Sequence, residues 1–120
     1  MGLLDELQSY RLAVRKVGLE RLPSAHVREW DGIGRADVVG RISQLSDADE
    51  NVRASDVPGL EAFIAVRSLC EPDGALVFTT DQEGEMLAKL AGEDIKAIAE
   101  AAMDLNGLGA EAVEAAAGKS

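Results

Sequence analysis

The sequence predicts a mostly helical α+β fold in which an N-terminal β-hairpin packs on about four helices. Apolar and polar residues alternate only near the N-terminus, over residues 10–30. Beyond residue 31, apolar residues recur at three- and four-residue steps, the spacing of one helix face. The length of 120 residues suits one domain, and no Pro-, Gln- or Ser-rich linker divides it. We expect a single domain over 1–120, with a hairpin region at 1–30, a helical body at 31–108 and an Ala-rich C-terminal tail at 109–120.

The hairpin region begins with a short amphipathic turn at residues 3–8. One side of this turn carries three leucines, Leu3, Leu4 and Leu7. A strand is predicted over residues 10–19, where apolar residues recur with a period close to two. The turn residues at 22–24 follow, and residues 25–30 alternate again, so the two strands are expected to pair.

Two helices are predicted in the middle of the chain. The first covers about residues 35–45, after a break that contains two glycines, and has an apolar stripe of Val38, Val39, Ile42 and Leu45. A polar loop over 46–56 follows. Asp56 can cap the second helix, which runs over about residues 58–70 and has proline in its first turn, where the missing N–H is harmless.

The segment after the second helix starts with a turn at residues 72–74. The apolar run at 75–78 is too short for a helix and predicts a brief strand or a buried crossing. Thr80 followed by Glu83 has the spacing of a capping box, so a helix is expected to begin there. Gly92 is expected to end this helix.

Another helix is predicted over residues 93–106, with acidic residues in its first turn. Its apolar stripe consists of Ile95, Ile98, Ala102 and Leu105. Asn106 and Gly107 are expected to stop it. A final Ala-rich helix is predicted over 110–117, and Val113 is its one large apolar anchor; such a short helix is marginal in water unless it docks.

Charge and composition exclude several classes of function. The formal net charge is −10, and residues 71–120 carry eleven acidic side chains against three lysines. Such a surface repels phosphate backbones, so nucleic-acid binding through this half is disfavoured. The single cysteine, Cys70, excludes an intrachain disulfide. No apolar run approaches the length of a membrane span and the N-terminus lacks the features of a secretory signal, so we expect no membrane association and a cytoplasmic location.

The residues with catalytic potential form no convincing site. Ser24, His26 and Asp31 are the residue types of a hydrolytic triad, but triad members usually converge from separate elements, and a structural role is favoured. Cys70 has no nearby histidine and lies on an apolar helix face, where a small core residue is the default. One histidine and one cysteine are too few for a usual metal site. We therefore expect no catalytic residue, no cofactor, no metal site and no enzymatic activity.

Several short motifs follow one another in a set order. Residues 63–70 (FIAVRSLC) lead into 71–79 (EPDGALVFT), and an acidic helical segment at 95–103 (IKAIAEAAM) precedes 105–108 (LNGL). This order, spacing and total length resemble the small tail assembly chaperones of long-tailed bacteriophages and prophages, of the HK97-like or lambda-like kind. In that family a helix ending in R-x-L leads to D-G-x-x-x-F-(T/S) and later to (N/S)-G-L. The resemblance covers about residues 60–117.

The resemblance implies a non-enzymatic chaperone of tail morphogenesis. Such proteins bind the tape measure protein, keep its long apolar helices soluble and help to recruit tail tube subunits. They act in the host bacterial cytoplasm and are absent from the mature virion. The resemblance also implies a homo-oligomer, or a complex with a longer form made by a ribosomal frameshift.

A chaperone for apolar helices needs an exposed apolar surface, because a helix laid in a groove is the expected mode of binding. The candidate partner-binding residues are Ile95, Ile98, Leu105, Leu108 and Val113. The alternative for these residues is ordinary core, which a chain of this size must build from most of its large apolar side chains. Two alternatives for the function also stay open: a structural head–tail or tail-completion protein, and a small-molecule binding module or enzyme.

Overall fold

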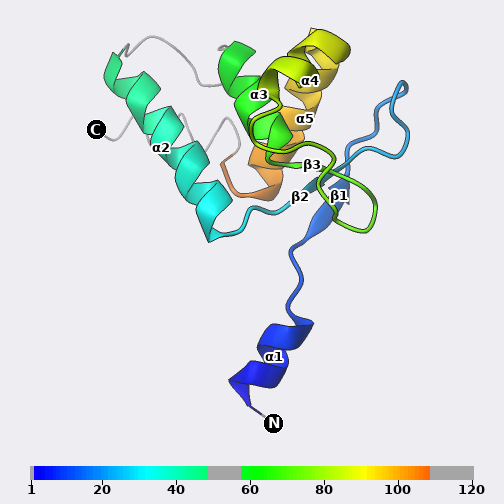
Figure 1. The fold of residues 1–120 in the computed structure, drawn as a ribbon, viewed down its shortest axis with the longest axis vertical. Coiled ribbons are helices and arrows are strands. Elements are labelled where there is room, and N and C mark those ends of the chain that lie inside the picture. Colours follow the sequence, from blue (N-terminus) through cyan, green and yellow to red (C-terminus); the bar gives the residue numbers. More distant parts are fainter. Residues whose placement is uncertain (1, 49–57, 109–120) are drawn as a thin grey trace.

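The structure, a computed structural model, describes residues 2–48 and 58–108. Five helices and three short strands occupy these residues, which confirms the predicted mostly helical α+β fold. In chain order they are α1 (Leu3–Ser9), β1 (Val14–Lys16), β2 (His26–Arg28), α2 (Gly32–Ala48), α3 (Pro58–Val66), β3 (Leu69–Cys70), α4 (Glu83–Lys89) and α5 (Gly92–Leu105). Figure 1 shows α3, α4 and α5 gathered above the sheet, with α2 along one side and α1 standing apart.

The sheet is antiparallel, in the order β1-β2-β3. Val14 faces Arg28 and Lys16 faces His26, so β1 and β2 form the predicted hairpin. Both strands are much shorter than the predicted 10–19 and 25–30. Val27, at the centre of β2, is fully buried, and its neighbours on either side are half-buried, the alternation expected of a strand with one covered face.

The third strand corrects a prediction. The helix expected to reach residue 70 ends at Val66, because the next two amides bond back three residues, Arg67 N–H to Ile64 O and Ser68 N–H to Ala65 O. The chain then turns, and Leu69 and Cys70 pair with β2 and are buried there. A run of apolar residues cannot distinguish a helix end from a buried strand when the strand is this short.

The core lies between α3, α5 and β2. α3 is apolar nearly all round and buries Leu60, Ala62, Ile64, Ala65 and Val66. α5 buries one face, made of Ile95, Ile98, Ala99, Ala102 and Met103. Trp30, just after β2, closes the end of this core. α5 ends where predicted, with Gly107 at a φ of 77°.

Helix α2 begins earlier than predicted, at Gly32. Asp31 accounts for the early start, because its Oδ1 accepts a hydrogen bond from the Gly34 amide at 2.8 Å. Of the predicted stripe, Val38 is fully buried and Ile42 packs against the core, whereas Val39 is exposed. The helix also continues to Ala48, into the segment expected to be a loop. The predicted cap at Asp56 lies outside the described residues.

The predicted boundaries of α4 are wrong. Gln82, not Thr80, precedes the helix, and it makes no side-chain cap. Its Oε1 instead accepts a hydrogen bond from the Thr79 amide at 2.8 Å. Gly92 begins α5 and does not end α4, which stops at Lys89.

The loop before α4 contains the predicted turn, with Gly74 at a φ of 93° and its amide bonded to Glu71 O at 2.8 Å. The run at 75–78 is neither a full strand nor a buried crossing. Leu76 makes one isolated bridge to Cys70, and both Leu76 and Val77 are exposed. The tail at 109–120, with the predicted helix at 110–117, lies outside the described residues.

Candidate protein-binding surface

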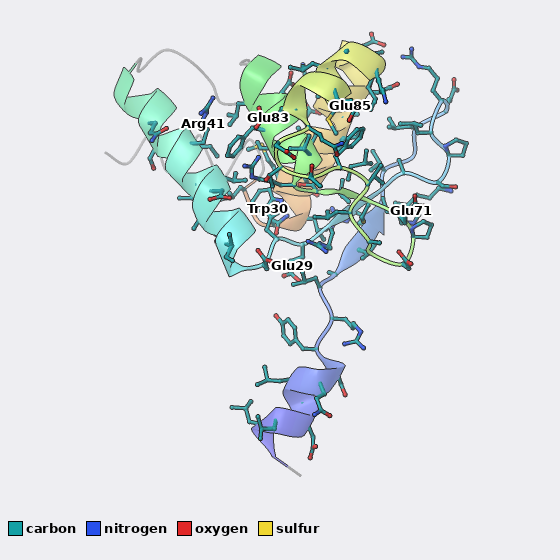
Figure 2. The ribbon with its side chains drawn as sticks, viewed as in Figure 1. Glu29, Trp30, Arg41, Glu71, Glu83 and Glu85 are labelled. Carbon is teal, nitrogen blue, oxygen red and sulfur yellow. The ribbon has the colours of Figure 1, made fainter. Side chains whose placement is uncertain are left out.

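Helix α1 is amphipathic and buries none of its residues. The four large side chains of its apolar stripe have exposed fractions between 57% and 76%: Leu3, Leu4, Leu7 and Tyr10. Figure 2 shows that α1 and its side chains stand apart from the body of the molecule. A seven-residue helix is marginal in water by itself, and the body of the molecule covers none of the residues of α1.

Hydrogen bonds form at both ends of the segment that connects α1 to the body. Arg11 Nη1 donates to the backbone carbonyls of Gln8 at 3.1 Å and Tyr10 at 2.8 Å, which ties the chain to the last turn of α1. At the other end, Ala13 O accepts from Glu29 N–H at 2.8 Å, and Ala13 N–H donates to Glu29 Oε1 at 3.1 Å. The connection to α1 therefore leaves the body next to Glu29, as Figure 2 shows.

The two acidic residues of α1 occupy different positions relative to its apolar stripe. Residues three or four apart share a helix face, so Glu6 lies beside Leu3 and Tyr10 at the edge of the stripe. Asp5 lies on the opposite side, above Ser9, whose hydroxyl bonds to Asp5 O. A partner that covers the leucines would therefore meet the Glu6 carboxylate and leave Asp5 in water.

A hollow of about 150 Å³ lies at the start of α2, and we call it the Trp30 hollow. Its apolar walls come from three elements, with Trp30 after β2, Ile33 in the first turn of α2 and Leu76 in the loop before α4. Ile33 has an exposed fraction of 76% and Leu76 one of 37%. The hollow thus has a buried aromatic floor and an exposed aliphatic rim.

Arg28 supplies the free positive charge of the Trp30 hollow. Its Nη1 donates to Gly74 O at 3.3 Å, while its Nε is buried and has no hydrogen-bond partner among the described residues. The two carboxylates that line the hollow are engaged elsewhere. Asp31 caps α2, and Asp37 Oδ2 lies 3.6 Å from Arg67 Nε. A half-buried guanidinium with an unused donor favours an anionic partner.

A second and larger groove, of about 320 Å³, lies between α2 and α3. Its centre is the stack of Arg67 on the Phe63 ring, with the guanidinium carbon 3.5 Å from the ring centroid. Arg67 also lies 3.6 Å from Glu83 as well as from Asp37, so its charge is balanced within the fold. The interactions of Arg67 at this groove hold α2, α3 and α4 together.

The structure places the predicted partner-binding residues inside the molecule. Ile95 and Ile98 are buried in the core face of α5, and Leu105 and Leu108 pack partly buried against that core. This placement is that of ordinary core, the alternative considered for them. Val113 lies outside the described residues. Among the described residues, the most exposed leucines lie on α1, and their side-by-side placement on one turn was the available signal.

The residues considered for catalysis make separate contacts. The His26 ring contacts its own turn, with Nδ1 2.8 Å from the Ser24 backbone oxygen, and Asp31 caps α2. Burial raises the pKa of the Cys70 thiol; Arg28 opposes this rise, and Asp73 and Glu71 add to it. Across residues 2–48 and 58–108, no group of three or more metal-type ligands is close enough to hold an ion. No helix in the described part has the length and apolar character to cross a membrane.

Comparison of the chain with protein-family models, with curated proteins and with solved structures found no match.

Proposed function

We propose that this chain is a non-enzymatic tail assembly chaperone of a long-tailed bacteriophage or prophage, and that it binds the tape measure protein through α1. The observation that carries the proposal is the apolar stripe of α1, which is wholly exposed although it holds three leucines and a tyrosine. The order of motifs that resembles the tail assembly chaperones supports the choice of client.

An exposed leucine stripe suits an apolar helical client. Two helices associate by burying such stripes against each other, and each leucine removed from water contributes about 1.5–3 kcal/mol. The body of the chain carries a large negative charge that opposes aggregation of the complex. The stripe thus supplies binding, and the acidic body keeps the bound client in solution.

Client binding through α1 leaves the fold of the body unchanged. The core between α3, α5 and β2 contains no residue of α1. The helix can therefore change partners without any loss of core packing. This separation is useful in a chaperone, which has to release its client when the tail is built.

The remaining parts of the proposal follow from the same role. The chain would act in the host bacterial cytoplasm, help to recruit tail tube subunits to the client, and be absent from the mature virion. It would act as a homo-oligomer or together with a longer frameshifted form. Detection of this chain in purified virions would favour a structural tail component instead.

Co-expression with the tape measure protein tests the proposal. We expect a helical fragment of the tape measure protein to be soluble and to co-purify with the intact chain. The triple variant Leu3→Ser, Leu4→Ser, Leu7→Ser should lose the client, whereas Leu87→Ser, which changes an exposed leucine on α4, should keep it. Retention of the client by the triple variant would refute binding through α1.

A further inference from the structure

We propose that two free copies of this chain exchange α1 helices, so that α1 of each copy occupies the Trp30 hollow of the other. The proposal goes beyond client binding and does not depend on which client the chain has. It joins two surfaces that the structure leaves uncovered: the stripe of α1 and the rim of the hollow.

The apolar stripe of α1 and the Trp30 hollow match in size. A cavity of about 150 Å³ accepts a group of the size of benzene, so the hollow has room for one leucine side chain. Leu7 lies at the centre of the α1 stripe, between Leu4 and Tyr10 on the helix surface. With Leu7 inserted towards Trp30, its neighbours on the stripe would cover the exposed side chains of Ile33 and Leu76.

Helix α1 and the Trp30 hollow have complementary charges. Helix α1 carries two acidic residues and no basic one, and Glu6 borders its apolar stripe. The hollow offers the Arg28 guanidinium, whose buried Nε lacks a hydrogen-bond partner in the described part of the chain. The Glu6 carboxylate would lie beside this guanidinium and balance its charge. Hydrogen bonds between charged groups are among the strongest in proteins when they are shielded from water.

A second copy of the chain is the source of the α1 that would occupy the Trp30 hollow. The chain's own α1 stands apart from its body (Figure 1) and buries no residue, so its apolar stripe is open to a second copy. Exchange of an identical element between two copies is a low-cost route to a dimer, because both contacts form at once. A client helix would then compete with the hollow for the same leucines, so the exchange would protect α1 until a client arrives.

Sedimentation equilibrium over a wide concentration range tests the exchange. We expect a monomer–dimer equilibrium for the intact chain. Leu7→Ser should weaken it by about a hundredfold or more, because two contacts each lose one buried leucine. The hollow variant Ile33→Ser with Leu76→Ser should weaken it too, and Leu87→Ser should leave it unchanged. All of these positions are exposed, so circular dichroism should show every variant folded.

A mixing experiment separates exchange from other modes of association. The Leu7→Ser chain keeps an intact hollow, and the hollow variant keeps an intact α1. Each variant alone should dimerise more weakly than the intact chain, and an equimolar mixture should form a heterodimer more readily than either variant dimerises, because one of its two contacts is complete. Glu6→Gln in the full chain should weaken the dimer by about tenfold, and Asp5→Asn, on the opposite side of α1, should not.

Four results would overturn the proposal. A chain that stays monomeric at millimolar concentration has no exchange. A hollow variant that dimerises as well as the intact chain places the contact elsewhere, and a mixture that stays monomeric does the same. A monomer in which Leu7 is protected from solvent would show α1 in its own hollow. None of these results concerns the client, whose binding is measured separately by co-purification.

Discussion

Trp30 Nε1 donates a hydrogen bond of 2.7 Å to Ser68 Oγ, inside the core. Ser68 is fully buried, and its hydroxyl in turn donates to Ile64 O at 2.7 Å. This chain of two hydrogen bonds ties the end of β2 to the last turn of α3. It also orients the indole that forms the floor of the Trp30 hollow.

Ser68→Ala should destabilise the fold by about 1–3 kcal/mol, because it leaves the buried indole N–H without an acceptor. Urea unfolding followed by tryptophan fluorescence measures the change, since Trp30 is the single tryptophan. Ser24→Ala, at an exposed position in the hairpin turn, is the control and should change the free energy of unfolding by less than about 0.5 kcal/mol. Equal effects of the two substitutions would contradict a structural role for the Trp30–Ser68 bond.

Arg67→Lys should cost about 1–2 kcal/mol of stability. The guanidinium is nearly buried, stacks on Phe63 at 3.5 Å and donates to Phe63 O at 2.9 Å, and a lysine ammonium cannot reproduce this planar arrangement. Arg41, which lies 5.4 Å from the same ring and is exposed, supplies the matched control. Arg41→Lys should be nearly neutral in urea unfolding. If Arg41→Lys lost as much stability as Arg67→Lys, the stacking of Arg67 on Phe63 would not account for the effect.

The stability of the fold should fall as the pH rises above about 9. Burial raises the pKa of the Cys70 thiol above its usual value of 9.0, so the unfolded chain loses this proton at a lower pH than the folded one. Below that pH the thiol is protonated in both states and contributes no pH dependence. Above it the unfolded state binds fewer protons, and the free energy of unfolding decreases with pH.

Urea unfolding at a series of pH values, with Cys70→Ala as the reference, measures this effect. The two proteins share every other ionisable group, so the difference between the two curves isolates the thiol. The curve of the intact chain should decline more steeply above pH 9. Parallel curves would contradict the raised pKa of Cys70.

The sequence predicted those elements that carry a long or repeated signal. The stripe of Ile95, Ile98, Ala102 and Leu105 extends over three turns, and α5 lies where expected. The hairpin was also predicted, because β1 and β2 alternate on either side of a strong turn signal. In both cases the local pattern and the tertiary packing favour the same structure.

The errors fall where a sequence signal was overruled by a specific contact between a few atoms, either tertiary or local. Leu69 and Cys70 continue the apolar pattern of α3, but pairing with β2 makes them a strand. Thr80 has the residue type and spacing of a cap, but a hydrogen bond from the Thr79 amide to Gln82 Oε1 shapes the turn and moves the start of α4. Such contacts between a few atoms leave no periodicity in the sequence.

The candidate partner-binding residues of α5 fall in the core for a related reason. Ile95 and Ile98 form the stronger apolar pattern, and the fold uses that pattern for its core. The leucines of α1 were recognised as one side of a short turn, but their freedom from the core depends on the extended connection through residues 10–13. Whether an amphipathic segment packs on its own body is decided by chain geometry, which a pattern of residues does not contain.

The most direct measurement is the amount of tape measure protein that stays soluble and co-purifies with this chain, compared between the intact protein and the Leu3→Ser, Leu4→Ser, Leu7→Ser variant. Both proteins should have the same free energy of unfolding within about 0.5 kcal/mol, because α1 contributes nothing to the core. We expect the intact chain to hold the client in solution and the variant to leave it in the pellet. Equal recovery of soluble client with both proteins would show that α1 is not the binding surface.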